Sequence, residues 1–540
     1  MEHPVGYSGY FSFGHGAFFG LGIYTTAVLT ARFRWPFLAT LPVAAAMAAL
    51  VAVLLGSIVF RVKRVRGELF ALLTLAVTFV LATIILNTPI DGGPGISLGG
   101  VAVPAIGPTP SSSFYFLELA AAAATLGVAC AIGRSKLGTG LFAIRDDEDV
   151  AEVLGVPTFR CKLIAFATSS ALAGVAGGIQ ALFISYVTAA ETFSILVPLT
   201  VVLMSVLGGT RHWAGPAVGA TLITVISYAS TAGDYPLAGK AALGAILIVV
   251  ILFMPEGVLG TLLDRHARRA FARRDLGLAA VAPPISSVDA TRPAIGAALL
   301  TVRDVSRAFA GIQALAHVDL SIRCGEIVGL LGPNGSGKST FINVVSGHYR
   351  ADAGSIDFDR HELTQLVAHQ IARLGVGRTY QIPRPFARLT VLENVVLTAM
   401  FGGAALDRRD ALLAASRWLE FTALADKAQA LPADLNLHQR KFLELARALA
   451  ARPKLLLLDE VLSGLTPTEI DSAVDLIRRI RDHGTTIVLV EHVMRAVLAL
   501  ADRIIVLDQG QVIADGRPHE VMTQAAVVNA YLGAEIDAAR

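Results

Sequence analysis

The first half of the chain is a series of long apolar runs separated by short polar connections. A helix that rises 1.5 Å per residue needs about 20 residues to cross a bilayer. The second and fifth runs are comfortably long enough, whereas the sixth is short, so it is either re-entrant or imprecisely bounded by the pattern. The pattern predicts helices in eight segments, near residues 14–31, 36–60, 68–86, 114–133, 161–187, 194–208, 214–231 and 240–256.

The second half has a different pattern, in which short apolar runs are set between polar stretches. EIVGLL (326–331), LLLLD (455–459) and TTIVLV (485–490) have the continuous apolar character of strands buried on both faces. About 10% of residues 1–257 are charged and about 22% of the remainder, against roughly 25% in a typical soluble domain. The first half therefore has the composition of a membrane domain and the second that of a soluble domain.

The stretch between the halves, residues 263–294, begins basic and becomes rich in Pro, Ser and Ala. This is typical of a juxtamembrane segment followed by a linker. We therefore expect a transmembrane domain over residues 1–257, a basic juxtamembrane segment and linker over 258–298, and a soluble domain over 299–540.

Basic residues indicate which helix ends face the cytoplasm. They follow the second, fourth, sixth and eighth apolar segments, whereas the loop after the third segment contains no Lys or Arg. The positive-inside rule then assigns four stretches to the cytoplasm, with Arg32 and Arg34 as exceptions. These stretches are residues 61–67, 134–160, 210–213 and everything after 257.

Composition excludes several other classes of protein. With 54% hydrophobic residues the chain is neither wholly soluble nor disordered, and a net charge of +3 gives no reason to expect nucleic-acid binding. Cys130, Cys161 and Cys324 form no CxxC pair, which fits a reducing compartment without a zinc site or disulfide framework. The start MEHPVGYSGYFSF lacks the features of a cleavable signal peptide. The apolar segments show no paired carboxylates or Asp/His relay, so an ion gradient is not the expected energy source.

A phosphate-binding loop follows the first soluble apolar run. The pattern GxxxxGK[ST] stands between a predicted strand and a predicted helix, the setting it requires. Its glycines let backbone N–H groups turn toward phosphate oxygens, and the helix N-terminus adds partial positive charge. Lys338 is expected to reach the β- and γ-phosphates and Ser339 to ligate Mg²⁺. The predicted nucleotide-binding residues are Gly332, Pro333, Asn334, Gly335, Ser336, Gly337, Lys338, Ser339 and Thr340.

Two further apolar runs end in polar residues suited to ATP hydrolysis. Asp459 closes LLLLD and is expected to hold Mg²⁺ through water, while Glu460 can polarise the attacking water as a general base. His492 follows the run TTIVLV and is placed to contact the γ-phosphate. We therefore predict Glu460 and His492 as catalytic residues.

With these motifs in order, residues 299–540 resemble the ATPases of ABC transporters. The resemblance implies ATP and Mg²⁺ as ligands, Phe309 as the aromatic residue that stacks on adenine, and Gln381 as a Mg²⁺ ligand that senses the membrane domain. LNLHQRKFLELARALA (435–450) matches the signature segment, in which Asn436, His438 and Gln439 would act on the ATP of a partner ATPase. VLSGLTP (461–467) matches the D-loop. The implied fold is a polytopic helical membrane domain followed by an α/β P-loop NTPase with a helical subdomain.

Within this class, both halves resemble branched-chain amino acid importers. GVGRTYQIPRPFARLTVLENV and the tail HEVMTQAAVVNAYLGAE are similar to their ATPases, and GYSGYFSFGHGAFFGLGIYTTAVL, GGPGI and LGGTRHWAGPAVGA to one of their permeases. The chain thus looks like a permease fused to its ATPase. Such permeases usually have further apolar helices before the first of these motifs, so we expect either a later start than usual or a shortened form.

The signature segment departs from the usual pattern. A Ser and, two residues later, a Gly normally contact the partner's γ-phosphate, and here these positions are Asn436 and His438. Asn can still donate a hydrogen bond, but His438 brings a bulky side chain to a place of close backbone approach. We therefore expect one competent and one impaired ATP site. Thr466 also replaces the Asp of many D-loops, a milder change.

The resemblance further implies a second permease subunit, a second ABC ATPase subunit and an extracytoplasmic solute-binding protein, in a bacterial plasma (inner) membrane with the ATPase in the cytoplasm. We expect the segment Arg145, Asp146, Asp147, Glu148 and Asp149 to be a coupling loop that docks in a groove beside Gln381, the alternative being a solvated charged loop. Two other functions stay open, an ABC exporter half-transporter and a nucleotide-gated channel or sensor. The resemblance does not name one solute; it implies a branched-chain or other hydrophobic amino acid, or a related small amide.

Overall fold

The computed structural model describes residues 7–62, 65–91, 93–210, 212–231, 244–245, 248, 257–262 and 296–538. The chain divides into two compact units, which are described separately. The first comprises Met1–Arg145 and Thr158–Leu278, and the second comprises Asp146–Pro157 and Ala279–Arg540. Residues 263–295 of the predicted juxtamembrane segment and linker lie outside the described residues, as does nearly all of the eighth apolar segment.

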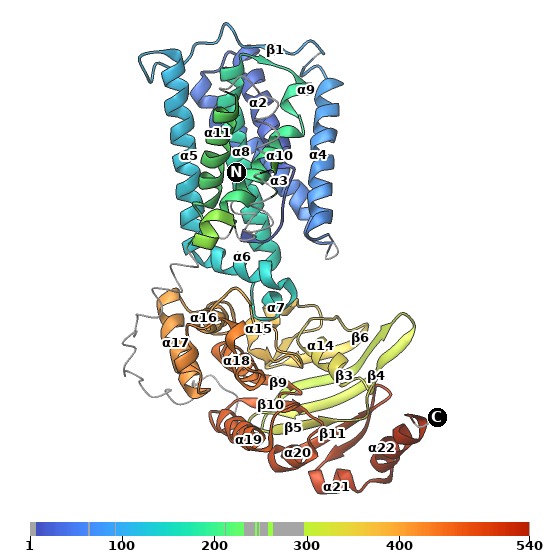
Figure 1. Cartoon of the computed structure of the whole chain (residues 1–540). Coiled ribbons are helices and arrows are strands. Elements are labelled where there is room, and N and C mark those ends of the chain that lie inside the picture. Colours follow the sequence, from blue (N-terminus) through green and yellow to red (C-terminus); the bar gives the residue numbers. More distant parts are fainter. Residues whose placement is uncertain are drawn as a thin grey trace. The chain divides into compact units, whose positions relative to one another are not determined.

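The first unit is a bundle of helices, and seven of the predicted segments are helical (Figure 1). In the described part of the chain, five helices are long and apolar enough to cross a membrane. The short sixth segment is one of them, because α9 (Ala189–Thr192) precedes it and the two together cover Ala189–Gly208. The seven helices are α2 (His15–Ala31), α3 (Phe37–Val59), α4 (Glu68–Leu86), α5 (Pro110–Arg134), α8 (Thr158–Ile184), α10 (Leu196–Gly208) and α11 (Gly215–Thr231).

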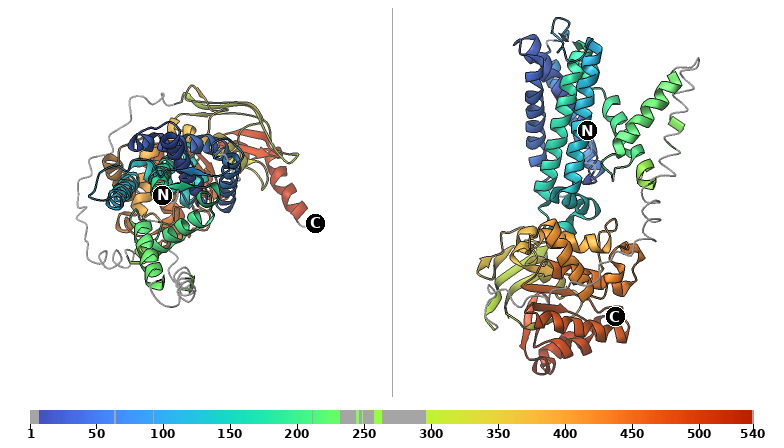
Figure 2. Two further views of the ribbon diagram at one scale, coloured as in Figure 1. Left: turned by 90° about the horizontal axis from the view of Figure 1, so that it is seen from above. Right: turned by 90° about the vertical axis from the view of Figure 1, so that its left-hand side faces the viewer.

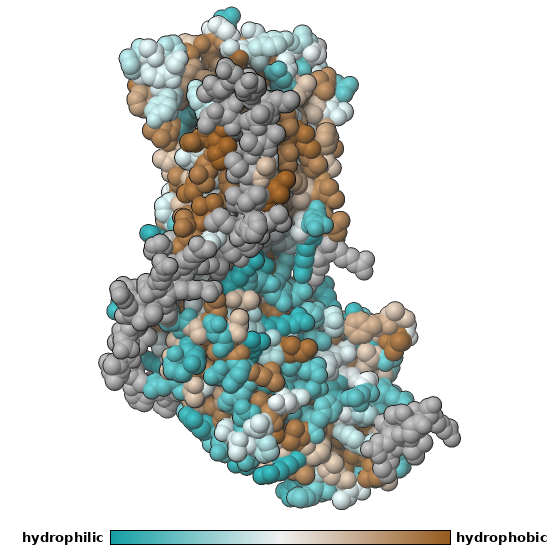
Figure 3. All heavy atoms as spheres, viewed as in Figure 1, coloured by the Kyte–Doolittle hydropathy of each residue, from teal (hydrophilic) through white to brown (hydrophobic). Residues whose placement is uncertain are grey.

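Small residues bring these helices into close contact. A Cβ on Gly22 of α2 would lie 2.1 Å from the carbonyl oxygen of Gly174 on α8, and one on Gly177 would lie 2.0 Å from that of Phe19. Similarly, a Cβ on Gly208 of α10 would lie 1.8 Å from the carbonyl oxygen of Gly215 in α11. Close backbone approach of this kind is how helices associate in lipid, where apolar surface alone gives no driving force. On the face shown in Figure 3, hydrophobic residues gather along the middle of the bundle and more hydrophilic ones at its upper end.

Smaller elements complete the first unit and lead into the second. A two-stranded antiparallel ribbon pairs β1 (Ile96–Ser97) with β2 (Tyr186–Val187). The helix α6 (Lys136–Asp146) ends where the second unit begins, and the short helix α7 (Glu148–Val153) belongs to the second unit. At the start of α5, Thr109 forms a capping box with Ser112 and Pro110 takes the first helical position.

The second unit contains two sheets (Figure 2). The larger has the order β12-β11-β5-β10-β9-β8, with every pair parallel except β12 and β11. Its strands are β5 (Ile327–Leu331), β8 (Val376–Arg378), β9 (Leu455–Asp459), β10 (Thr486–Val490), β11 (Arg503–Asp508) and β12 (Gln511–Gly516). The smaller sheet is antiparallel, in the order β4-β3-β6-β7. Its strands are β3 (Ala298–Phe309), β4 (Ile312–Arg323), β6 (Ala353–Phe358) and β7 (His361–Glu362).

Helices surround these sheets in two groups. Helices α16 (Val391–Phe401), α17 (Arg408–Phe421) and α18 (Leu437–Ala450) pack on one another as a separate helical part. The remaining helices are α14 (Lys338–Val345), α15 (Ala368–Leu374), α19 (Pro467–Asp482), α20 (Met494–Leu500), α21 (Pro518–Met522) and α22 (Ala525–Ala538). The three apolar runs predicted as buried strands are β5, β9 and β10, and all their residues are buried. Because β10 lies between β5 and β9, the polar residues that follow these strands meet at one edge of the sheet.

Candidate functional site

The phosphate loop follows β5 and leads directly into α14. Gly332 has φ +145°, and a Cβ there would lie 2.0 Å from the carbonyl oxygen of Leu507, so only glycine fits. Gly337 is the left-handed N-cap of α14, with φ +106°. Around them, Asn334, Gly335 and Ser339 are exposed, Pro333 and Thr340 are half-buried, and Ser336 is buried. The loop therefore ends at the N-terminus of α14, whose first N–H groups have no partner within the helix.

Lys338 is buried in this loop. Its Nζ donates to the carbonyl oxygens of Gly332 at 2.7 Å and Pro333 at 2.8 Å. Burial lowers the pKa of Lys338, while the nearby carboxylates of Glu460 and Asp459 act in the opposite direction. The ammonium group is thus held by loop carbonyls at the site where phosphate oxygens would replace them.

Glu460 lies between two of the other predicted residues. Its Oε2 accepts a hydrogen bond from Nε2 of Gln381 at 2.8 Å, and its Oε1 is 3.1 Å from Nε2 of His492. Glu460 has φ +49°, a left-handed conformation that costs a non-glycine residue about 1–3 kcal/mol. The backbone N–H of Glu460 donates to the carbonyl oxygen of Val490 on the neighbouring strand, which holds this conformation in place. The structure therefore brings together the predicted base Glu460, Gln381 and His492.

Asp459 has the surroundings of a cation ligand. It is 5% exposed, and among the described residues its Oδ1 has no hydrogen-bond partner. Burial raises its pKa, opposed by the charges of Arg378 and Lys338. The described residues contain no group of three His, Cys, Asp or Glu side chains that could hold a metal. A Mg²⁺ ion here would therefore need hydroxyl, amide and phosphate oxygens as well, which are ligands that Mg²⁺ accepts.

Phe309 ends β3 as part of an aromatic and cationic stack. Its ring centroid is 5.0 Å from that of Tyr349, and the guanidinium carbon of Arg307 lies 4.7 Å from the Phe309 centroid. The half-buried ring is therefore accessible for stacking on a base.

The signature segment forms the start of α18. Asn436 is the N-cap, and a capping box pairs it with Gln439 in both directions, at 2.8 and 3.1 Å. This leaves the N–H groups of Leu437 and His438 directed out of the helix start. The ring of His438 packs on that of Phe442, one turn along the same helix, with centroids 4.1 Å apart. The side chain that we expected to obstruct the helix start is therefore folded along the helix.

Comparisons with known proteins agree with this geometry. The family described as "Branched-chain amino acid transport system / permease component" matches residues 4–253, and the family described as "ABC transporter" matches residues 315–463. The chain is 38% identical over 249 residues to the high-affinity branched-chain amino acid transport ATP-binding protein LivG of Salmonella typhimurium, covering 44% of this chain and 98% of that protein. The corresponding protein BraF of Pseudomonas aeruginosa is 36% identical with the same coverage. This chain belongs to the ABC transporter family.

The transporter therefore carries a permease component and an ABC ATPase in one polypeptide. The lipopolysaccharide export system ATP-binding protein LptB of Escherichia coli is also 35% identical, over 242 residues that cover 44% of this chain and 98% of LptB. The ATPase is thus similar both to proteins named for branched-chain amino acid transport and to a protein named for export.

The acidic segment of the transporter's predicted coupling loop contacts the ATPase inside the second unit. The backbone N–H of Arg388 donates to Oδ2 of Asp146 at 3.0 Å, and Asp147 lies 3.7 Å from the guanidinium of Arg384. Glu148 and Asp149 form the first turn of α7, and Arg145 belongs to the first unit. A Cβ on Gly155 would lie 2.3 Å from the carbonyl oxygen of Phe401, so glycine permits a close approach to α16. The loop lies on residues that follow Gln381, whose own side chain contacts Glu460.

Sequence reasoning missed two buried charged residues beneath Glu460. Lys441 of α18 donates through Nζ to the carbonyl oxygens of Glu460, at 3.1 Å, and of Ser463. Glu491, which is 2% exposed, accepts a hydrogen bond from the N–H of Leu462 at 2.6 Å. Through these hydrogen bonds, Lys441 connects α18 and Glu491 connects the end of β10 to residues 460–463, where the D-loop begins. The available signal was a charged residue directly after a buried strand run, at position 491.

The buried Glu491 makes stability depend on pH. Burial is the main reason that its pKa is raised from 4.5 to about 7; the charge of Glu460 acts in the same direction, and the hydrogen bond from Leu462 and the charge of Lys441 act against it. Because the folded protein keeps this proton to higher pH than the unfolded chain, stability falls as pH rises from about 4.5 to about 7. We expect Glu491→Gln to remove this loss and to stabilise the protein at pH 8 by up to about 3 kcal/mol.

Thermal unfolding of the full chain in detergent at pH 5 and pH 8 checks this expectation. The matched control is Glu469→Gln, because capping hydrogen bonds from Thr466 lower the pKa of that exposed carboxyl, so its removal should give no gain at pH 8. An equal response of the two variants to pH would show that Glu491 is not the group responsible.

Proposed function

We propose that this chain is half of an ATP-driven importer for branched-chain or other hydrophobic amino acids. The observation that carries the proposal is the joint match of residues 4–253 to a branched-chain amino acid permease family and of the second half to ATPases named for the same transport. The remaining parts would be a second permease subunit, a second ABC ATPase and an extracytoplasmic solute-binding protein. The complex would lie in a bacterial inner membrane with the ATPase in the cytoplasm, and domain boundaries at about 257 and 299 fit the composition.

The ATP site would work through residues of two chains. The phosphate loop and Lys338 would bind the phosphates, Phe309 would stack on adenine, and Ser339, Gln381 and Asp459 have oxygens to hold Mg²⁺. Bound Mg²⁺ would neutralise charge on the β- and γ-phosphates. Glu460 would take the proton of the attacking water, since its carboxylate is already oriented by Gln381 and His492. Asn436, His438 and Gln439 would serve the partner's ATP.

Two alternatives compete with this proposal. An ABC exporter half-transporter has the support of LptB-like ATPase sequences, but the permease family matched by the first half is named for amino acid transport. A nucleotide-gated channel or sensor was suggested by His438, and the packing of its ring on Phe442 weakens that argument because the ring lies along the helix. An importer couples hydrolysis to arrival of the loaded binding protein, and neither alternative does.

The test of the proposal is ATP hydrolysis by the assembled complex in lipid nanodiscs. We expect the solute-binding protein loaded with leucine to stimulate steady hydrolysis several-fold, and the unloaded protein to stimulate it less. Hydrolysis that is indifferent to the binding protein but stimulated by an apolar solute in the membrane would favour the exporter. Nucleotide binding without steady turnover would favour the channel or sensor.

A further inference from the structure

Helix α18 contains a buried ion pair whose contribution to stability is doubtful. Glu444 and Arg447 lie one turn apart with Nη1 2.7 Å from Oε1, and both side chains are almost fully buried. Among the described residues, Nε and Nη2 of Arg447 have no hydrogen-bond partner. Burial of an incompletely bonded ion pair costs about as much as the attraction returns, and apolar residues often stabilise such a position equally well. We therefore look for the role of this pair in the backbone groups that it binds, rather than in the stability of the fold.

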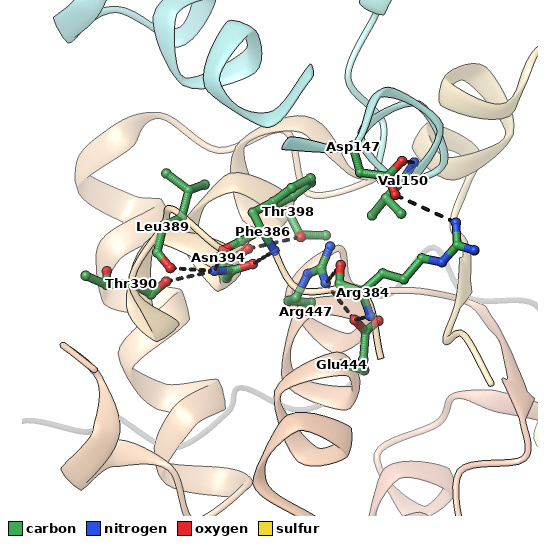
Figure 4. Close-up of polar contacts among 10 residues, drawn as sticks. All are labelled: Asp147, Val150, Arg384, Phe386, Leu389, Thr390, Asn394, Thr398, Glu444 and Arg447. Carbon is green, nitrogen blue, oxygen red and sulfur yellow. Dashed lines mark hydrogen bonds and ion pairs between the residues drawn. The ribbon is translucent and has the colours of Figure 1, made fainter. Parts of the chain in front are cut away.

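The pair holds the backbone of a single residue in the loop that follows Gln381. The N–H of Arg384 donates to Oε1 of Glu444 at 2.9 Å, and the carbonyl oxygen of Arg384 accepts from Nη1 of Arg447 at 2.8 Å. Both polar groups of that residue are thus bound by the same ion pair (Figure 4). The guanidinium of Arg447 also lies over the ring of Phe386, 4.8 Å from its centroid.

The other end of this loop is fixed from α16. Oδ1 of Asn394 accepts from the N–H of Phe386 at 2.8 Å, and its Nδ2 donates to the carbonyl oxygens of Phe386, Leu389 and Thr390 at 3.0–3.1 Å. Asn394 is fully buried, so these bonds are protected from water. Residues 384–390 therefore form a loop with a rigid backbone, held by α18 at one end and by α16 at the other.

The side chain of Arg384 points from this rigid loop to the acidic segment of the predicted coupling loop. Its guanidinium is 3.7 Å from Oδ2 of Asp147, while the carboxylate of Asp147 also accepts from the N–H of Val150 and caps α7. The Arg384–Asp147 pair is largely exposed, and such pairs contribute little unless their geometry is fixed. Its geometry is set by the ion pair that holds the Arg384 backbone.

We propose that Glu444 and Arg447 are positioning residues that make the signature helix α18 and the coupling loop move together through Arg384. This rests on the proposed function, in which the start of α18 contacts the ATP of the partner. The expected consequence has a direction. Binding of nucleotide at the partner's site would shift α18, and this shift would move this chain's own coupling loop through Arg384.

The test removes the pair without leaving a buried charge. In the assembled complex we compare the double variant Glu444→Leu/Arg447→Met with the single variant Arg384→Met and with the triple variant. Hydrogen exchange of residues 146–157 and 384–388 should rise about three- to tenfold in the double variant, and the triple variant should add little because all three residues act through one contact. Uptake per ATP hydrolysed should fall by a similar factor.

The matched control is Asp359→Leu/Lys454→Met, which removes a partly buried ion pair of the same unit; among the described residues, this pair forms no hydrogen bond or ion pair with residues 146–157. It should leave exchange at 146–157 unchanged. Unchanged exchange there in the Glu444/Arg447 double variant, with the fold intact by thermal unfolding, would overturn the proposal. Independent effects of Arg384→Met and the double variant would also overturn it. Because exchange is measured without transported solute, a transporter of different function would still give this readout.

Discussion

Replacing Glu460 by Gln is expected to slow ATP hydrolysis at this chain's site by about 10²- to 10⁴-fold while ATP stays bound. The amide has nearly the same shape and can still accept hydrogen bonds through its oxygen, but it cannot take a proton from water. Gln381 and His492 contact the two carboxylate oxygens of Glu460, so the substitution removes the base and leaves the neighbouring geometry in place. Retention of radiolabelled ATP by the complex after gel filtration, together with single-turnover hydrolysis, measures both effects.

Two controls separate this result from general damage. Lys338→Ala should lose ATP retention. The ammonium group now donates to loop carbonyl oxygens and would donate to phosphate oxygens when ATP binds, and the variant lacks this group. Glu469→Gln, at an exposed carboxylate that caps α19, should retain normal turnover. Undiminished hydrolysis at this site by the Glu460→Gln variant would refute its role as the base.

Reversing the charges of the coupling loop is expected to have the second-largest effect. Asp146→Arg/Asp147→Arg places cations against Arg388 and Arg384, which the two carboxylates now contact. Like charges at a contact cost several kcal/mol, so uptake should fall about tenfold or more. Basal ATP hydrolysis should persist, since neither residue lies at the nucleotide site.

The arginines provide a rescue experiment. Adding Arg384→Asp and Arg388→Asp restores opposite charges with reversed polarity, and uptake should recover in part. If uptake falls in the charge-reversed variant and is not rescued, the substitutions have damaged the protein elsewhere. If uptake is unchanged in the charge-reversed variant, the segment is only a connection between helices and has no coupling role.

Much of the fold could be predicted because its determinants are local in sequence. Apolar runs match seven helices of the first unit, and three buried strands carry the polar residues that end at the ATP site. Boundaries were less accurate where polar residues set them: α5 begins at Pro110 rather than near residue 114, because Thr109 and Ser112 cap it. The sixth segment is longer than its apolar run, since α9 extends it.

The contacts that join distant segments could not be predicted from the sequence pattern. These contacts depend on loops whose paths no sequence periodicity specifies. Examples are the hydrogen bond between Gln381 and Glu460, and the hydrogen bonds that Glu444 and Arg447 form with the backbone of Arg384. His438 is different, because the aromatic residue four positions later, Phe442, was visible in the sequence and this spacing brings side chains together on a helix. That signal would have predicted the folded ring.

The central claim, that this chain uses ATP to bring a hydrophobic amino acid inward, is tested most directly by uptake into proteoliposomes. The assembled complex is reconstituted with ATP and Mg²⁺ inside, and the solute-binding protein with radiolabelled leucine is added outside. The account predicts accumulation of leucine above the external concentration, abolished in the Glu460→Gln variant and absent without internal ATP. Leucine that only equilibrates across the membrane, or that leaves the vesicles as ATP is consumed, would contradict it.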